Sequence, residues 1–423
     1  MRYKAEIFDK VQYMFKETGY NDHQLHSVIY FENQLNLNTL KQAIILLLKT
    51  VPILNCKFCL NKGNSYWESK SKIDVDKVLE VVQSKEDLEM FTCSTTNEKT
   101  GPQIRMCLYR GQEDTLSIIL NHMVCDGAGF KQCVYLLSDI YSGLMKNPNY
   151  KPDLIINGDR GIHKLTSQFK FYQKLKLLFL QNAESNQKNR SQLIESNKEN
   201  TSPFILRHEL LEDLFRGIYD YSKQNNVTIN DTILTAYYRV LSNMMKQYGK
   251  PFNIAIMIDM RKYLKEKPTD ILTNYSSTII TEATVNEVDD FKTTLFQINQ
   301  FMKKNKDKLM GVNGFLKLEI PFKLFNQKKS YSIVKKNLKN PYIGMTNIGI
   351  IDSKQLYFQS TKIRNAFICG SIKYKPHFQI ALSTFEDKLT FTSNLYGDEK
   401  DKELIMSCFA MLDKELKAAV AVQ

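Results

Sequence analysis

The stretch that most restricts how this chain can fold is residues 115–144, where a strand pattern changes to a helix pattern across a glycine-containing turn. Alternate residues of the predicted strand over 115–122 share one face, and they are Leu116, Ile118, Leu120 and His122. His122 therefore continues an apolar face, and we expect its side chain to point inward. The turn MVCDGAG follows, and apolar residues at helical spacing then predict a helix through residues 130–144. The unit places His122 and the turn after it at the end of a strand.

The rest of the chain mixes strand and helix patterns in both of its halves. Further strands of the first half are predicted over residues 24–32, 53–58, 64–69 and 103–110, with a helix between Asn38 and Pro52. Strands of the second half are predicted over 203–209, 253–260, 274–285, 342–351, 363–369, 377–385 and 388–396, and helices over 211–225, 227–251, 288–308 and 398–420. The simplest organisation is an N-terminal subdomain (1–150), a crossover linker (151–202) and a C-terminal subdomain (203–423), both subdomains of the α/β (α+β) class.

The linker differs in character from the two halves. Residues 181–201 are polar and nearly free of large apolar side chains, whereas the short segment 168–180 is amphipathic and carries Lys and Phe together. A helix lying on a membrane surface would have this composition, but packing against a domain is the interpretation that we favour.

Composition limits the classes of partner and the compartment. Lys and Arg number 58 and Asp and Glu 45, so the formal net charge is +13, which fits either a surface for an acidic partner or a solvated Lys-rich surface. No Arg-rich block or alternation of basic and aromatic residues indicates binding of nucleic acid. The eight cysteines include a single CxxC pair, Cys56 and Cys59, so we expect reduced thiols and no metal site. The N-terminus has no signal-peptide pattern, and the apolar runs are too short to span a bilayer, so we expect a cytoplasmic protein without a transmembrane segment.

The turn after the strand carries the residues that favour chemistry. His122 stands four residues before Asp126, and Gly127 follows at once. A neutral imidazole can take a proton from a hydroxyl, thiol or amine at neutral pH, provided that the ring is held in one orientation. Gly127 allows the tight turn that this requires. The turn would bury Asp126, which then needs a cation, and Arg261 at the end of the predicted strand 253–260 is the candidate. That ion pair would hold the histidine loop against the other half.

The segment NHMVCDGAG resembles the HxxxDG motif of acyltransferases related to chloramphenicol acetyltransferase. This superfamily includes condensation domains of nonribosomal peptide synthesis, plant-type BAHD acyltransferases, polyketide-associated acyltransferases and microbial alcohol acetyltransferases. Other segments along the chain resemble elements of these enzymes and occur in the same order as in the enzymes. They are DKVQYMF at 9–15 (their N-terminal entry strand), LNTLKQAIILLLKTVPILNCKF, VTINDTILTAYYRVL, IMIDMRKYL with LTNYSST, and GMTNIG at 344–349.

The resemblance implies a V-shaped pair of chloramphenicol-acetyltransferase-like subdomains, each a mixed sheet with packed helices, around a tunnel with His122 at its midpoint. His122 would act as the general base that deprotonates an acceptor as it attacks a thioester. The donor would be acyl-CoA, or an acyl group on the phosphopantetheine of a carrier protein, and it would serve as a co-substrate rather than as a permanently bound cofactor. Asp126 would have a structural role, with no metal and no covalent acyl-enzyme. We expect a monomer.

Two departures narrow the resemblance. Condensation domains usually carry two consecutive histidines, whereas the first of these positions is Asn121 here. The BAHD signature DFGWG is absent, and residues 388–397 read KLTFTSNLYG. Both favour the branch of alcohol acetyltransferases and polyketide-associated acyltransferases.

The chemistry also needs a donor for the oxyanion that develops on the thioester oxygen. The candidates are the amide of Gly127 and the hydroxyls of Ser276, Ser277 and Thr346, and the tunnel candidates near them are Asn274 and Asn347. Cys125 occupies a variable position inside the motif, and we expect it to pack rather than react.

Three functions stay open on the sequence. The first is transfer from acyl-CoA to a hydroxyl or amine of a small-molecule acceptor. The second is a condensation-type enzyme that uses carrier-bound substrates in natural-product biosynthesis. The third is a non-catalytic binding or scaffold relative, against which the intact HxxxDG motif argues.

Overall fold

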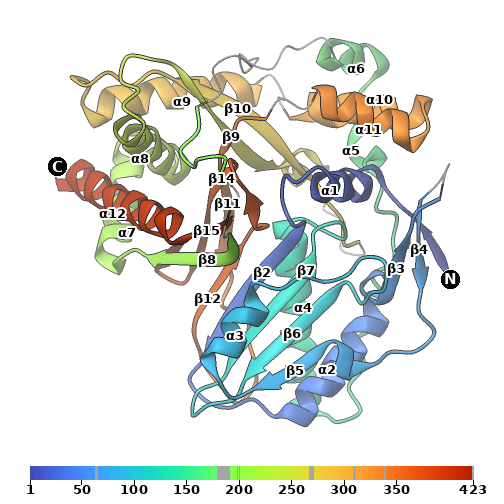
Figure 1. The fold of residues 1–423 in the computed structure, drawn as a ribbon. Coiled ribbons are helices and arrows are strands. Elements are labelled where there is room, and N and C mark those ends of the chain that lie inside the picture. The colour runs from blue at the N-terminus through green and yellow to red at the C-terminus, as the bar shows by residue number, and fades with distance from the viewer. Residues whose placement is uncertain are drawn as a thin grey trace.

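The computed structural model describes residues 1–61, 65–178, 191–197, 199, 201–265, 271–307, 311–337 and 340–421. Two mixed sheets, each covered by helices, form the two main bodies of the molecule, and a small three-stranded sheet lies beside them (Figure 1). This architecture confirms the predicted α/β class with two mixed sheets and packed helices.

The first body is built on a five-stranded sheet in the order β12-β2-β7-β6-β5. Its strands are β2 (Gln24–Phe31), β5 (Leu79–Val82), β6 (Ile104–Tyr109), β7 (Thr115–Asn121) and β12 (Ile363–Cys369). Two helices cover one face and one helix covers the other, and these are α2 (Leu37–Thr50) with α4 (Gly127–Lys146), and α3 (Lys85–Thr92) (Figure 1). The alternation predicted for β7 explains this layering, because Ile118 joins the core on the α2 and α4 side whereas Ile119 packs with Phe91 of α3.

The second body is built on a seven-stranded sheet in the order β10-β9-β11-β14-β15-β13, with β8 paired to β15. Its strands are β8 (Ser202–Glu209), β9 (Phe252–Asp259), β10 (Ser276–Ala283), β11 (Ile343–Ile351), β13 (Lys373–Tyr374), β14 (Phe378–Phe385) and β15 (Lys388–Gly397). Its helices are α7 (Glu212–Gln224), α8 (Ile229–Met244), α9 (Phe291–Asp307) and α12 (Glu399–Ala421). The apolar faces of α8 and α12 close the core of this half, with Tyr237 and Phe409 fully buried.

One strand of the second half completes the sheet of the first. After β11, the chain passes along α4, where the hydroxyls of Ser138 and Ser142 donate to the carbonyls of Gln355 and Tyr357. The chain then enters β12, which pairs antiparallel with β2. The two halves are therefore joined by backbone hydrogen bonds as well as by side chains. The boundaries predicted at residues 150 and 202 stay predictions.

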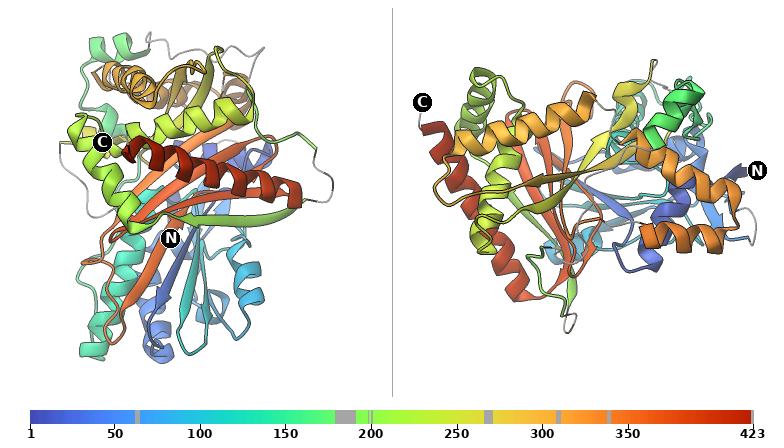
Figure 2. Two further views of the ribbon diagram at one scale, coloured as in Figure 1. Left: turned by 90° about the vertical axis from the view of Figure 1, so that its left-hand side faces the viewer. Right: turned by 90° about the horizontal axis from the view of Figure 1, so that it is seen from above.

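The remaining elements gather around the N-terminal helix. The small sheet consists of β1 (Arg2–Lys4), β3 (Cys56–Cys59) and β4 (Tyr66–Ser69). The helices are α1 (Ile7–Glu17), α5 (His163–Thr166), α6 (Phe171–Leu178), α10 (Val312–Leu324) and α11 (Gln327–Asn337), and the 3-10 turns are η1 (Pro52–Asn55), η2 (Val75–Lys77) and η4 (Met260–Tyr263). Helices α10 and α11 lie beside α1 at the end of the molecule that carries the N-terminus (Figures 1 and 2).

Several predicted elements need correction. Residues 9–15, expected as an entry strand, lie in α1, because Glu6 and Asp9 form a capping box and Val11 and Met14 are buried at helical spacing. The helix predicted over 227–251 ends at Met244, and the chain leaves it through positive φ angles at Lys246 and Gly249. The strand predicted over 53–58 begins as η1, and only its second part is in β3. Most of the polar stretch 181–201 lies outside the described residues.

Candidate active site

A cavity of about 670 Å³ lies where the two halves meet. The first half contributes His122 and Gly127 to its lining, and the second half contributes residues of β9 to β11 and β13. Helices α1, α10 and α11 supply a largely apolar part of the wall, including Val11, Phe15, Leu318 and Val334. The HxxxDG motif therefore lies at the wall of a cavity that both halves form.

His122 directly follows β7, and its backbone fixes its place. The amide of His122 donates to the carbonyl of His23 at 2.8 Å, and the carbonyl of His122 accepts from Nδ2 of Asn274 at 2.9 Å. In the ring, Nδ1 lies 2.9 Å from the carbonyl oxygen of Cys125. Because a carbonyl can only accept, Nδ1 carries the proton of the neutral ring and Nε2 is left as the basic nitrogen. The turn thus selects one tautomer and one orientation.

The environment keeps this ring neutral. Burial lowers the pKa of His122 below its usual 6.5, and the nearby charge of Lys373 acts in the same direction. The carboxylate of Asp126 and the hydrogen bond to Cys125 oppose the shift without reversing it. At neutral pH the imidazole is therefore in the form that accepts a proton.

Asp126 is fully engaged by groups other than the histidine ring. Its Oδ1 caps α4 by accepting from the amide of Gly129 at 3.0 Å. Its Oδ2 accepts from Arg261 Nη1 at 2.8 Å, from the amide of Tyr275 at 2.7 Å and from the hydroxyl of Ser276 at 3.1 Å. Burial raises the pKa of this carboxyl, but the guanidinium and these donors outweigh burial and hold the pKa below its usual range. The ion pair predicted between Asp126 and Arg261 is present.

Arg261 reaches Asp126 from η4, the turn that ends β9. The side chain of Asp259 caps this turn and also accepts from Nη1 of Arg261 at 3.1 Å, and Nη2 donates to the carbonyl of Thr273 at 2.9 Å. The guanidinium lies over the ring of Tyr275, 5.3 Å from its centroid. Arg261 therefore connects the histidine loop of the first half to two segments of the second.

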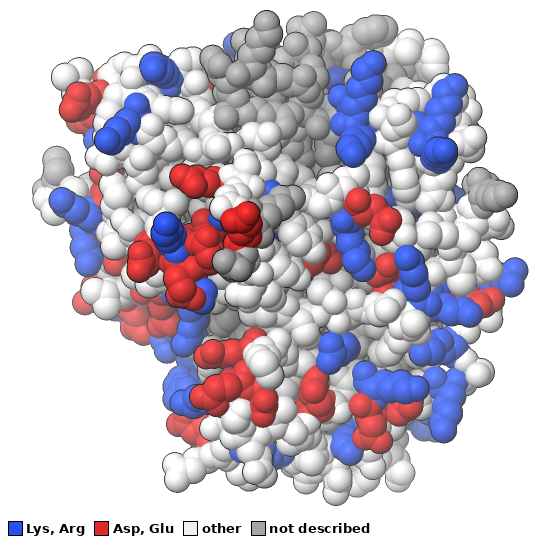
Figure 3. Space-filling view, viewed as in Figure 1, with Lys and Arg blue, Asp and Glu red and all other residues white. Residues whose placement is uncertain are grey.

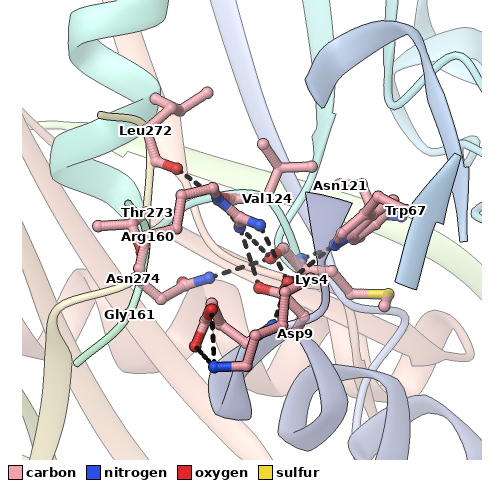
Figure 4. A network of polar contacts seen from close by, with 12 residues as sticks. Lys4, Asp9, Trp67, Asn121, Val124, Arg160, Gly161, Leu272, Thr273 and Asn274 are labelled. Carbon is pink, nitrogen blue, oxygen red and sulfur yellow. Dashed lines mark hydrogen bonds and ion pairs between the residues drawn. The ribbon is translucent and has the colours of Figure 1, made fainter. Parts of the chain in front are cut away.

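A second arginine, Arg160 of the linker, was not singled out by the sequence (Figure 4). Its Nη1 and Nη2 bind both oxygens of Asp9 at 2.9 Å. Nη2 also donates to the carbonyls of Met123 and Val124, and Nε donates to the carbonyl of Leu272. Arg160 thus holds the backbone of the histidine loop from behind. The sequence offers no local pattern for it, because all of its partners are distant along the chain.

The other predicted site residues have different surroundings. Asn274, Ser276, Ser277 and Thr346 line the cavity, whereas Asn347 is not among the residues that line it. The hydroxyl protons of the two serines are already used, since Ser276 donates to Asp126 and Ser277 donates to the carbonyl of Gly311 at 2.8 Å. Asn347 donates to Asn230 and accepts from the amide of Gly349, so it supports a bulge of β11. Thr346 makes no such internal hydrogen bond within the described chain.

The thiol inside the motif is unsuited to nucleophilic chemistry. Cys125 is fully buried, and burial raises the pKa of its thiol well above the usual value. A thiolate is therefore absent at neutral pH, in agreement with a packing role. Within the described ranges, no group of three or more His, Cys, Asp or Glu side chains could hold a metal ion.

The charge surplus is not gathered into one patch on the face shown in Figure 3. Lys and Arg side chains are interspersed with Asp and Glu, and acidic side chains gather in the left central part of this view. Over the part of the chain that the structure describes, no helix is both long and apolar enough to cross a bilayer.

Comparisons with known proteins define the class of fold. No protein-family model matches the sequence, and no curated protein matches it significantly. Solved structures do match along nearly the whole chain, so this protein has the two-subdomain fold of chloramphenicol-acetyltransferase-like and condensation-domain acyltransferases. The resemblance predicted from the HxxxDG segment is confirmed at the level of fold.

Three of these structures give the extent of the likeness. Polyketide synthase associated protein 5 from Mycobacterium tuberculosis is 12% identical, with a TM-score of 0.70, over 98% of this chain and 97% of that one. Trichothecene 15-O-acetyltransferase from Fusarium sporotrichioides is 11% identical, with a TM-score of 0.73, over 98% and 95%. The first condensation domain of the CDA synthetase is 9% identical, with a TM-score of 0.72, over 99% and 96%.

Proposed function

We propose that the protein is an acyltransferase that moves an acyl group from acyl-CoA to a hydroxyl or amine of a small-molecule acceptor. The observation that carries this proposal is the state of His122. Its ring lines the cavity between the halves, its Nδ1 is fixed on the carbonyl of Cys125, and its pKa is lowered. These are the requirements for a general base that acts at neutral pH.

The reaction would proceed by direct attack on the thioester. Nε2 of His122 takes the proton of the acceptor as its oxygen or nitrogen bonds to the thioester carbon. When the resulting tetrahedral intermediate collapses, the carbon–sulfur bond breaks and the proton passes from Nε2 to the departing thiolate. The products are an ester or amide and free CoA, so no bound cofactor or covalent enzyme intermediate is needed.

The negative charge on the tetrahedral intermediate needs a hydrogen-bond donor. Thr346 is the hydroxyl that we favour, because it lines the cavity while the protons of Ser276 and Ser277 are used elsewhere. The start of α4 at Gly127 also lines the cavity, and the partial positive charge of a helix N-terminus favours an oxyanion there.

Asp126 and Arg261 would act by positioning. Because Asp126 accepts from four groups other than the imidazole, it does not relay a proton from His122. The pair instead fixes the turn on which the base is mounted.

Two alternative functions stand beside this proposal. In one the acyl donor is a carrier protein instead of CoA, and in the other the protein is a scaffold without catalytic activity. The likeness to a condensation domain of a peptide synthetase favours a carrier-protein donor as the second candidate. On the face that Figure 3 shows, basic and acidic side chains are interspersed, and they form no broad basic patch of the kind that would suit an acidic carrier. A non-catalytic scaffold has no need of a neutral, tautomer-fixed histidine beside a cavity.

The test is release of free thiol from acyl-CoAs of two to sixteen carbons, each offered with a panel of alcohols and amines. The native protein should release CoA in an acceptor-dependent way, and His122→Ala should lower the rate by about 100-fold or more, the usual contribution of a general base. His163→Ala is the matched control, because His163 is exposed and lies outside the cavity.

Each outcome has a separate meaning. If His122→Ala retains full activity, the assignment of the base is wrong. If acyl groups are transferred only from a phosphopantetheinyl carrier, the donor is a carrier protein. If neither donor is turned over with any acceptor, the acyltransferase proposal fails and a binding role takes its place.

A further inference from the structure

Lys373 is a buried charged side chain in the cavity wall, and neither the motif nor the proposed chemistry accounts for it. It begins the short strand β13, is 7% exposed and lines the same cavity as His122. Its ammonium lies 4.9 Å from the centroid of the Tyr20 ring. Desolvation of a charged group is unfavourable unless another group compensates for it, so a buried lysine needs an explanation.

Among the residues that the structure describes, this ammonium has no direct ion-pair partner, and Asp22 is the carboxylate whose charge acts on it from a distance. Its Nζ makes no ion pair or hydrogen bond there. Burial lowers the pKa of Lys373 to about 8, and the charge of Asp22 opposes this shift without reversing it. Lys375, two residues on, is equally buried but contacts Asp401 at 2.8 Å. Within the described residues, the lysine outside the cavity therefore has a direct ion-pair partner, whereas the lysine in the cavity has none.

The backbone around Lys373 holds it at the cavity wall. The amide of Ile372 donates to Oδ1 of Asp22, and the amide of Asp22 donates to the carbonyl of Ile372. The hydroxyl of Ser371 donates to the carbonyl of Gln24 at 2.7 Å. These bonds clamp the segment before β13 against the start of β2, so the strand cannot shift to carry the ammonium into water without breaking them.

We propose that Lys373 binds a carboxylate of the acyl acceptor, so that the acceptor is a hydroxy acid or an amino acid. This inference rests on the proposed function and names its substrate class. The parts of an acyl-CoA that must reach His122, the thioester and the pantetheine amides, carry no charge. The acyl chain suits the apolar wall of α1, α10 and α11. The group that complements the ammonium therefore belongs to the acceptor.

The same contact would link binding to catalysis. Lys373 is close enough to His122 for its positive charge to contribute to the lowered pKa of the imidazole. A carboxylate on Lys373 would cancel this contribution and make His122 a stronger base when the acceptor is in place. Asp126, the other charge that acts on the ring, is held by Arg261 and does not change on binding.

Binding tests the inference without requiring turnover. The probes are ω-hydroxyalkanoates of two to eight carbons and their ω-hydroxyalkanamides, which have nearly the same shape without the charge. By calorimetry at pH 7, the native protein should bind at least one carboxylate tenfold or more tightly than its amide. His122→Ala should keep this preference, because the proposal assigns the carboxylate to Lys373.

The decisive variant is Lys373→Met, which fills similar space without a charge. It should fold, and it should bind the carboxylate and the amide within about twofold of each other. Lys362→Met is the control for loss of one positive charge, because the Lys362 side chain is 72% exposed, and it should behave as the native protein does. Should Lys373→Met not fold, Lys373→Gln serves in its place.

The outcomes separate this inference from the proposed function. No preference for the carboxylate at any chain length, or a preference that survives in Lys373→Met, overturns the inference. Thiol release from acyl-CoA with neutral alcohols but no carboxylate preference would leave the acyltransferase standing and refute the substrate class. Carboxylate preference without thiol release would refute the acyltransferase, and the site would then be a carboxylate-binding site only.

Discussion

Arg261 Nη1 lies 2.8 Å from Oδ2 of Asp126, and this ion pair joins the turn after β7 in the first half to the turn after β9 in the second. The carboxylate side chain is 1% exposed and that of the arginine 10%. Neither charge has access to enough water to be stable alone, so each side chain holds the other in place. The position of His122, four residues before Asp126 in the same turn, therefore depends on this pair.

Asp126→Asn should therefore destabilise the fold. The amide keeps the shape of the side chain but removes the buried counter-charge of Arg261 and leaves it only the half-exposed Asp259, and the loss of one partner of a buried ion pair costs about 3–5 kcal/mol. Urea denaturation at pH 7 measures the loss. Asp387→Asn is the control, since Asp387 and its partner Arg216 are each 59% exposed, and it should change stability by less than about 1 kcal/mol. Equal stability of Asp126→Asn and the native protein would contradict the structural role.

Arg160 should prove hard to replace even with another cation. Arg160→Lys keeps the charge, but an ammonium has three donors and cannot reproduce the paired contacts to Asp9 together with the carbonyls of Met123, Val124 and Leu272. We expect kcat to fall while the protein still folds, because the histidine loop loses its support. The measurement is kcat beside the urea midpoint. Native kcat in Arg160→Lys would show that the loop is held sufficiently without it.

The sequence predicted those parts of the site that depend on local order. The change of period at 115–144 fixed the strand, the turn and α4, and the charges at the ends of two predicted strands suggested the pair of Asp126 and Arg261. The entry strand expected at residues 9–15 came from the resemblance and was wrong, because the capping box of Glu6 and Asp9 and the packing against α10 favour a helix.

Contacts between residues far apart along the chain could not be predicted from the sequence. Arg160 stands in a loop of polar and charged residues, and only the fold brings Asp9 to it across 151 positions. Lys373 stands in the segment SIKYKP, which reads as an exposed strand end, because burial of a lysine leaves no pattern in its neighbours. The pairing of β12 with β2 depends on register between strands more than 300 positions apart. Such contacts are set by tertiary packing, which periodicity does not encode.

The pH dependence of the reaction should show the charge of Lys373. Because burial and that charge lower the pKa of His122, the acidic limb of kcat/KM for a neutral acceptor should lie below pH 6.5. In Lys373→Met the positive charge is gone, so the pKa of His122 rises and the acidic limb moves to higher pH. The pH profiles of the two proteins with the same alcohol measure this shift. An unchanged limb would mean that the two side chains are not electrostatically coupled.

Glycines at the start of α4 should respond differently to an added methyl group. At Gly127 a Cβ would lie 2.9 Å from Cδ1 of Ile348, the flexible end of a side chain on the cavity wall. At Gly129 it would lie 2.7 Å from Cβ of Cys125 and 3.3 Å from Cδ1 of Leu272, in the packed core behind the histidine loop. Gly129→Ala should therefore lower the free energy of unfolding by about 1–3 kcal/mol. Gly127→Ala should keep most of its stability and lose kcat/KM, because the methyl group narrows the cavity beside His122. Urea midpoints and kcat/KM of both variants test the contrast. If Gly127→Ala were the less stable variant, Gly127 would not face the cavity while Gly129 faces the core.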